Sequence, residues 1–186
     1  MPIAIALIRG INVGGKNILP MAVLRELCEG LGLCDVRTYI QSGNVAFRAE
    51  ARQVAKAAAA IEAAIEGSRK FRPSVIVRTL EEVRAAFAAN PFAARKGLDK
   101  SRCLIMFLGA APTPAAKRAV LKLEAGRDEV RVIGREAFLN LPDGIAKSTM
   151  SMADVEVALG VRGTCRNLNT LEKLVGIAQE LEAGPH

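Results

Sequence analysis

A glycine-rich stretch directly after a short apolar run is the clearest chemical signal in the sequence. Residues 9–17 contain three glycines, two asparagines and two cations, and residues 3–8 before them are apolar. Glycine allows backbone N–H groups to converge on an anion, and a lysine adds positive charge. The alternative is a tight turn in which the polar side chains satisfy only local backbone groups. The predicted ligand contacts in this loop are Arg9, Asn12, Gly14, Gly15, Lys16 and Asn17.

The same stretch matches the phosphate-binding P-loop up to its last position. Gly10-x-x-x-x-Gly15-Lys16 should be followed by Ser or Thr, which would hold Mg²⁺, but Asn17 stands there. Three residues, 18–20, separate the motif from the next predicted helix, and no apolar strand ending in Asp offers the metal-holding partner. We therefore predict contact with an anion and not nucleotide hydrolysis.

Catalytic chemistry has few candidates in this chain. The only histidine is the final residue, His186, which argues against His-based metal sites and His general-base catalysis. The four cysteines lack C-x-x-C spacing and are expected to be reduced core residues. Lysines could act as acids or electrostatic catalysts, serines as nucleophiles and cysteines as thiols, but none has an activating partner nearby in sequence. These candidates are Lys16, Lys147, Ser42, Ser148, Cys28 and Cys34.

Composition sets the class of protein. A chain of 186 residues with 51% hydrophobic residues is long and apolar enough for one large or two small folded domains. No apolar run approaches the roughly 20 residues that span a bilayer, and no signal-peptide pattern is present, so we expect a cytoplasmic protein. The net charge of +7 favours anionic partners, unless it reflects only an Arg-preferring genome.

The elements that must position the loop follow a β-α-β-β-α-β order in the first half. Pro20 suits the start of a helix that stops near Gly30, and Gly67 is expected to end the second helix. Ser42-Gly43 marks a turn between two strands. This order is the split βαβ pattern of a ferredoxin-like plait. The predicted strands are 3–8, 36–41, 45–48 and 74–78, and the predicted helices are 20–30 and 51–66.

The second half repeats the pattern more loosely. A helix capped by Thr79 ends before Asn90-Pro91, and the basic residues 92–101 read as a linker. We predict strands at 103–108, 129–133, 136–141 and 164–167, and helices at 112–123, 151–159 and 171–181. The fold class is therefore α+β, with two ferredoxin-like halves whose antiparallel sheets carry helices on one face. The predicted domains are 1–92 and 93–186.

Plait topology brings the glycine-rich loop beside the turn between the second and third strands. The first and second strands run in the same direction, so the segments that follow them share one edge of the sheet. The loop before the fourth strand, which carries Arg69, Lys70 and Arg72, reaches that edge too. Amide side chains can read hydrogen-bond patterns on a base, sugar or peptide. Tyr39 points either to this rim or to the core. The predicted contacts in the turn are Gln41, Ser42, Gly43 and Asn44.

A second polar cluster is expected at one edge of the second sheet, next to two helix N-termini, which favour anions. Plain helix capping is the stronger interpretation for the serine and asparagine residues. For Arg166, a ligand site and an interdomain salt bridge stay equally open. The residues of this cluster are Lys147, Ser148, Arg166 and Asn167.

Three motifs resemble one bacterial family over nearly the whole chain. Residues 9–17 (RGINVGGKN), residues 37–45 (RTYIQSGNV) and residues 163–167 (GTCRN) are similar to the signatures of the domain of unknown function 1697 family. The resemblance implies two ferredoxin-like halves and implies no activity. Two positions depart from the family, which tends to carry Trp where this chain has Leu168 and a basic residue near Thr149. If those residues serve a ligand, this chain binds it differently or not at all.

We interpret the chain as a binding protein for a small anionic or nucleotide-like ligand. No cofactor, metal or membrane partner is predicted, and a monomer is favoured. Phosphate-contacting nucleic-acid binding is an alternative, because the plait is the fold of the RNA-recognition module. With aromatic residues at 4%, stacking platforms for bases are scarce. An enzyme without His or metal chemistry and a structural protein stay open as well.

Overall fold

The computed structural model describes residues 1–124 and 126–184. These residues form two compact units. Unit 1 comprises Met1–Arg84 together with the chain from Lys173 onward, and unit 2 comprises Ala85–Glu172. The division at residues 92 and 93 stays a sequence-based prediction. No described helix combines the length and the apolar character needed to cross a membrane.

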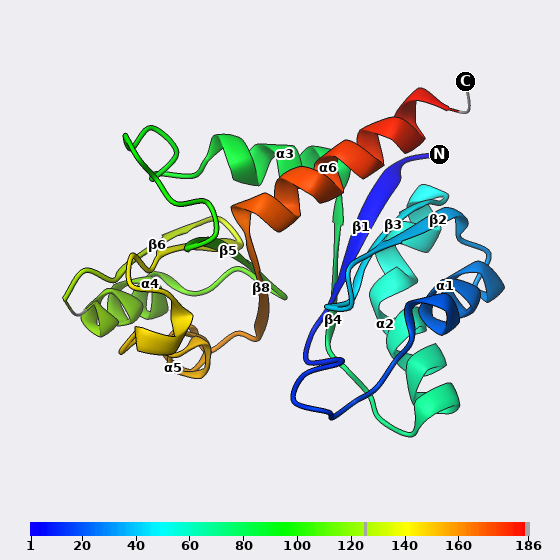
Figure 1. Cartoon of the computed structure of the whole chain (residues 1–186), viewed down its shortest axis with the longest axis horizontal. Coiled ribbons are helices and arrows are strands. Elements are labelled where there is room, and N and C mark those ends of the chain that lie inside the picture. The colour runs from blue at the N-terminus through cyan, green and yellow to red at the C-terminus, as the bar shows by residue number, and fades with distance from the viewer. Residues whose placement is uncertain (125, 185–186) are drawn as a thin grey trace. The chain divides into compact units, whose positions relative to one another are not determined.

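Unit 1 is the predicted ferredoxin-like plait. Its sheet has the order β2-β3-β1-β4, and every neighbouring pair is antiparallel. Two helices cover the same face of this sheet (Figure 1). The strands are β1 (Ile3–Ile8), β2 (Cys34–Tyr39), β3 (Asn44–Arg48) and β4 (Val75–Thr79), and the helices are α1 (Met21–Gly30) and α2 (Ala51–Arg69).

The central strand β1 is buried along its whole length, which explains its unbroken apolar sequence. Alternate residues of a strand point to opposite faces. One set, represented by Ala6 and Ile8, joins the core under the helices, where it meets Leu24 of α1 and Ile61 of α2. Full burial of an Ile or Leu side chain contributes about 1.5–3 kcal/mol. This core therefore holds the ends of β1 and β3 in place, and with them the loops that follow.

Helix α2 is longer than the sequence predicts. Gly67 lies inside the helix and does not end it. The helix ends at Arg69, where Lys70 adopts a left-handed conformation with φ 58° and donates its N–H to the carbonyl of Glu66 at 3.0 Å. At the other end, Glu50 and Gln53 form a capping box that starts the helix.

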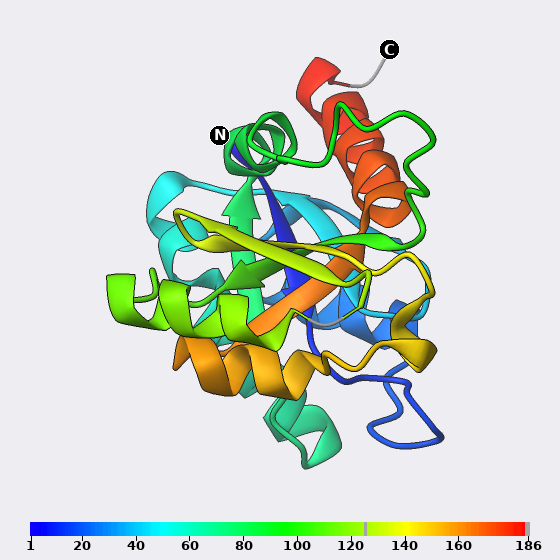
Figure 2. The same ribbon diagram turned by 90° about the vertical axis from the view of Figure 1, so that its left-hand side faces the viewer.

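Unit 2 has the same plait with the strand order β6-β7-β5-β8. Its helices α4 and α5 lie side by side on one face of the sheet (Figure 2). The predicted helix at 112–123 is split, with a 3-10 turn at Leu121–Leu123 closing it. The elements are β5 (Cys103–Leu108), α4 (Pro114–Val120), β6 (Glu129–Ile133), β7 (Glu136–Asn140), α5 (Met152–Leu159) and β8 (Gly163–Asn167).

The last strand of each plait runs into a helix without a loop. Helix α3 (Leu80–Ala88) follows β4, and helix α6 (Leu168–Ala183) follows β8. Thr79 Oγ1 accepts the N–H of Glu82 at 3.1 Å, and Asn167 Oδ1 accepts the N–H of Thr170 at 2.9 Å. Both caps stand between an arginine and a leucine. The same arrangement, a strand followed directly by a helix whose first turn is capped by a polar side chain, therefore occurs in both halves, although the two halves show no clear sequence repeat.

The close approach at Gly43 gives a stability test of the turn between β2 and β3. A Cβ at this position would lie 2.7 Å from Ile11 Cδ1 and 2.9 Å from Ile8 Cβ, and φ is +76°. We expect Gly43→Ala to lower the free energy of unfolding by about 2–5 kcal/mol through overpacking and left-handed strain. Gly14→Ala is the control, because φ is +57° there but no atom lies within 4 Å. Its loss should be only about 1 kcal/mol in urea titrations. Equal losses would refute the packing argument.

Candidate functional site

Three segments meet at the end of the unit 1 sheet, and we call them together the loop edge. They are residues 9–19 after β1, residues 40–43 between β2 and β3, and residues 70–74 before β4. The N–H of Ile8 donates to the carbonyl of Gly43 at 2.8 Å, and the N–H of Arg9 donates to that of Ser74 at 2.9 Å. Figure 1 shows the first segment as the dark-blue loop that projects beyond β1. The structure thus brings together the segments that plait topology places at one edge.

The first segment is a miniature hairpin. Val13 and Lys16 form an antiparallel bridge, and the N–H of Lys16 donates to the carbonyl of Val13 at 3.0 Å. Gly14 and Gly15 occupy the tip with φ values of 57° and 74°. Two positive φ values in succession are the signature of a type I′ turn, which suits glycine best. The glycines therefore serve a tight turn, and they leave the hairpin tip open to solvent.

The side chain of Asn12 holds the hairpin against the neighbouring turn. Its Nδ2 donates to the carbonyl oxygens of Leu19 at 2.9 Å and Gln41 at 2.8 Å, and its Oδ1 accepts the N–H of Leu19 at 2.8 Å. Both amide hydrogens are used, so this side chain has no donor left for a ligand. Asn12 closes the base of its own loop and joins that loop to the turn between β2 and β3.

Two further asparagines have the same kind of role. Asn17 Nδ2 donates to the carbonyl of Gly10 at 2.9 Å, and Asn44 Nδ2 donates to the carbonyl of Tyr39 at 3.0 Å and to Ser42 Oγ at 2.9 Å. Asn44 is fully buried. The three asparagine side chains predicted to contact a ligand in this rim are therefore engaged with backbone groups. Among the predicted residues of the rim, those exposed without such a role are Gly14, Gly15, Lys16 and Gln41.

The loop edge also exposes apolar side chains that sequence reasoning missed. Val13, Ile18 and Ile40 are 65%, 55% and 47% exposed. The sequence predicts Ile40 within a strand at 36–41, but β2 ends at Tyr39, and Ile40 has φ 49°. A β-branched residue in the left-handed region is strained by about 1–3 kcal/mol. The strain is borne because Asn44 and the β2–β3 pairing fix both ends of the four-residue turn.

The cations of the loop edge divide into paired and exposed groups. Arg72 forms ion pairs with Glu62 at 3.3 Å and Glu66 at 3.0 Å, so it ties the segment before β4 to α2. The hydrogen bonds that Arg72 donates to the carboxylates of Glu66 and Glu62 raise the pKa of its guanidinium. Lys16 and Lys70 are exposed, and Arg9 is half-buried. The positive charge that faces solvent at this edge therefore comes from the hairpin and from the end of α2.

The residues of the second predicted cluster have local roles in unit 2. Ser148 Oγ donates to Asp128 Oδ2 at 2.8 Å and accepts the N–H of Met150 at 3.0 Å, while Lys147 is exposed. Arg166 donates to Thr164 Oγ1 and to the carbonyl of Cys165, and burial lowers its pKa to about 10. Asn167 caps α6, as the capping interpretation expects.

The two positions that depart from the family pattern differ in their surroundings. Leu168 is 4% exposed and opens α6, where its N–H donates to the carbonyl of Lys100 at 3.1 Å. Thr149 is exposed. An apolar side chain therefore fills the place of the expected Trp within unit 2, and the place of the expected basic residue lies on the surface.

Unit 2 has a basic hollow that the sequence presented only as a linker. Its volume is about 310 Å³, and it is polar in character. Three of its arginines are paired: Arg95 with Glu129, Arg102 with Asp99 and Arg127 with Asp143. Most of its charge is thereby compensated, which weakens it as an anion site. The lining residues are Arg95, Lys96, Gly97, Leu98, Asp99, Arg102, Arg127, Asn140 and Pro142.

Two of the nucleophile candidates, Cys28 and Ser42, have surroundings that do not favour attack, whereas the Ser148 hydroxyl donates to the Asp128 carboxylate. Burial raises the pKa of the Cys28 thiol to about 12, so this thiol is protonated at neutral pH. Ser42 Oγ accepts a hydrogen bond from the Asn44 amide, which does not act as a base. Among the described residues, no group of three or more His, Cys, Asp or Glu side chains is arranged to hold a metal ion.

Removing the Asn12 amide tests whether its hydrogen bonds hold the segments of the loop edge together. We expect Asn12→Ala to lower the free energy of unfolding by about 2–3 kcal/mol, because the Leu19 N–H and two carbonyls lose their partner. Gln41→Ala is the matched control. It removes an exposed amide but keeps the backbone carbonyl that Asn12 uses, so its effect should stay within about 0.5 kcal/mol. Urea titration measures both, and a neutral Asn12→Ala would contradict the assignment.

The Arg95–Glu129 pair gives unit 2 a testable pH dependence. Hydrogen bonds from Arg95 are the largest cause that lowers the pKa of Glu129, from 4.5 to about 2. The ionised carboxylate is favoured in the folded state, so its contribution is complete above about pH 4.5 and is lost as the pH falls toward 2. We expect thermal unfolding temperatures of the wild type to fall more steeply between pH 5 and pH 2 than those of Glu129→Gln, which cannot titrate. Parallel profiles would show that this pair contributes nothing.

Comparison with known proteins gives a family and a fold. A family model described as protein of unknown function, DUF1697, matches residues 1–138. Among solved structures, the chain is similar to a conserved bacterial protein from Streptococcus pneumoniae, with a TM-score of 0.69 and 25% sequence identity. That similarity covers 95% of this chain and 98% of the other. The curated proteins contain no match.

Proposed function

The chain belongs to the DUF1697 family, as its motifs predict, and from this premise we propose that it is a binding protein whose loop edge engages an anionic, nucleotide-like ligand. One observation carries the proposal. Three asparagine side chains are used to hold the loops, while Lys16, the hairpin tip and Gln41 are left exposed. A rigid surface of this kind has little conformational entropy to lose when a ligand binds.

The chemistry of the exposed groups suits a phosphate attached to an apolar body. The Lys16 ammonium and the backbone N–H groups at the glycine tip are donors for an anion. A Cβ added at Gly14 or Gly15 would meet no atom within 4 Å, so a ligand can approach the backbone closely. Val13 and Ile18 offer apolar contact beside these donors. Gln41 adds an amide that can pair with the edge of a base.

Backbone strain supports the same location. Strained residues persist where the surrounding structure over-determines them, and they cluster at binding sites. Ile40 is both strained and exposed, so neither core packing nor an ordinary turn preference accounts for its type. The side chain is held at the surface beside Gln41, where a bound ligand could cover it.

Single-stranded nucleic acid is the second candidate, and the distribution of charge favours it. Arg69 and Lys70 lie at the same edge as the hairpin and are exposed, so the positive surface extends beyond the reach of one phosphate group. Tyr39 is half-buried and the exposed apolar residues are aliphatic, so stacking of bases contributes little. Binding would depend mainly on phosphate contacts and would weaken steeply with salt.

Substitution of Lys16 tests whether ligand binding depends on this one charge or on the overall positive charge of the protein. We expect Lys16→Ala to weaken binding of a fluorescent nucleoside triphosphate about tenfold in anisotropy titrations, because a charge-assisted contact is lost. Lys122→Ala removes another exposed lysine, in unit 2, and should change the affinity less than twofold. A wild type that binds neither nucleotides nor a 12-nucleotide oligomer, or equal effects of the two variants, would contradict the proposal.

The dependence of affinity on salt concentration distinguishes a nucleotide from single-stranded nucleic acid as the ligand. If single-stranded DNA is the partner, the logarithm of its affinity should fall linearly with the logarithm of salt concentration, and Lys16→Ala should reduce that slope by about one phosphate contact. If the ligand is a single nucleotide, the oligomer should bind no more tightly than the nucleotide does. A salt-insensitive complex with the oligomer would exclude the second candidate.

A further inference from the structure

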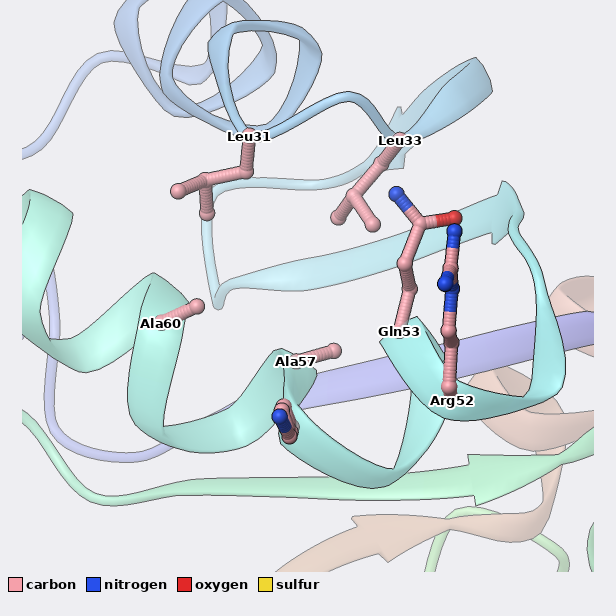
Figure 3. Close-up of a pocket in the computed structure, with 7 residues that line it drawn as sticks. Leu31, Leu33, Arg52, Gln53, Ala57 and Ala60 are labelled. Carbon is pink, nitrogen blue, oxygen red and sulfur yellow. The ribbon is translucent and has the colours of Figure 1, made fainter.

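A hollow of about 390 Å³ lies in unit 1 at the beginning of β2, whereas the loop edge lies beyond the end of that strand. It is formed by the turn that joins α1 to β2 and by the first half of α2, which face each other (Figure 3). Its volume is within the range of sites for small molecules, about 300–1,000 Å³. The lining residues are Leu31, Leu33, Arg52, Gln53, Lys56, Ala57 and Ala60.

The floor of the hollow is apolar. Leu33 is 5% exposed and Ala57 is 2% exposed, and both belong to the core of unit 1. The chain bends at Gly32, whose φ is +76°, so that Leu31 and Leu33 both reach toward α2 (Figure 3). The facing positions on α2 are the small residues Ala57 and Ala60, which leave the space between the helix and the leucines unfilled.

The rim of the hollow is positively charged. Arg52 and Lys56 are exposed and stand one turn apart on α2, and neither has a carboxylate partner among the described residues. Like charges at this spacing disfavour a helix. Arg52 also lies in the first turn, which contains no acidic residue, although the positive end of the helix dipole favours anions there. The carboxylate of Glu50 is engaged as the helix cap with the N–H of Gln53.

This combination costs the free protein stability and would be offset by a negative charge. The three unfavourable features are two adjacent cations, a cation at a helix N-terminus and a hollow beside the half-buried Leu31 and Ala60 that no side chain fills. All three are relieved together by a ligand that has an anionic head and an apolar tail. Gln53 Oε1 accepts the N–H of Glu50 at 3.0 Å, and its Nε2 donates to the carbonyl of Gly32 at 3.5 Å, so one amide hydrogen is left for the head group.

We propose that the hollow binds an amphipathic anion, namely the carboxylate form of a free medium-chain fatty acid. The head group lies at Arg52 and Lys56, and the alkyl chain covers Leu31, Leu33 and Ala60. The site is separate from the loop edge and does not depend on the function proposed there. Each methylene that enters the hollow should tighten binding by about fourfold, until the available volume is filled.

Calorimetric titration of the full chain with hexanoate, octanoate and decanoate, below their micelle concentrations, tests this site. Decanol is the uncharged probe of the same length as decanoate. We expect affinity to rise from hexanoate to decanoate, and decanoate to bind at least tenfold more tightly than decanol. The double variant Arg52→Gln/Lys56→Gln should remove that tenfold advantage while decanol affinity changes less than twofold. Lys16→Gln, at the loop edge, should leave decanoate binding unchanged.

A variant of the floor provides an independent test. Ala60→Leu fills the hollow from a half-buried position and should weaken both decanoate and decanol at least fivefold, with circular dichroism verifying the fold. The charge variants are at exposed positions, so they keep the test valid if this variant does not fold. Absence of saturable decanoate binding to the wild type, or affinity independent of chain length, overturns the proposal. The proposal is also overturned if the wild type is a dimer that decanoate does not affect and that Ala60→Leu dissociates. That result would assign the hollow to a second copy of the chain.

Discussion

The side-chain amide of Asn12 is the contact on which the geometry of the loop edge depends. It binds the carbonyl and N–H of Leu19 in its own segment and the carbonyl of Gln41, which lies 29 residues further along the chain than Asn12. A loop of twelve residues between a strand and a helix would otherwise leave its backbone groups to water. With this single amide in place, the hairpin tip and the turn at 40–43 become parts of one surface. The residue type follows from the task, since Asn both tolerates φ 55° and offers donors and an acceptor.

The asparagines and lysines of the loop edge have different roles. The side chains of Asn12, Asn17 and Asn44 hydrogen-bond to backbone groups of the loops. The side chain of Lys16 projects into solvent from the hairpin that these bonds hold in place. This division explains why a loop rich in asparagine is not itself a reader of ligand hydrogen bonds. It also explains how a projecting loop keeps a definite shape, because the core under β1 and the amide contacts restrain it from both ends.

The sequence reveals the fold more readily than it reveals the site. Apolar alternation and turn residues predict both plaits, because each strand and helix has one dominant period. Plait topology then places the loop after β1 beside the turn before β3. What escapes is local: Gly67 stays helical because its neighbours are good helix formers, and Ile40 leaves the strand because the turn demands a left-handed residue. The hollow beside α2 escapes as well, since alanine on a helix gives no sign of what lies opposite.

At the direct junctions between β4 and α3 and between β8 and α6, the side of the sheet to which each strand residue points fixes which face of the following helix is turned toward the core. Without a linker, one inserted residue would rotate the whole following helix by about 100° about its axis. It would also exchange the two faces of the strand residues before it. Arg78 and Arg166 occupy matching registers opposite the third residue of each central strand, Ile5 and Ile105. At this junction each plait should therefore tolerate substitutions but not the insertion or deletion of a residue.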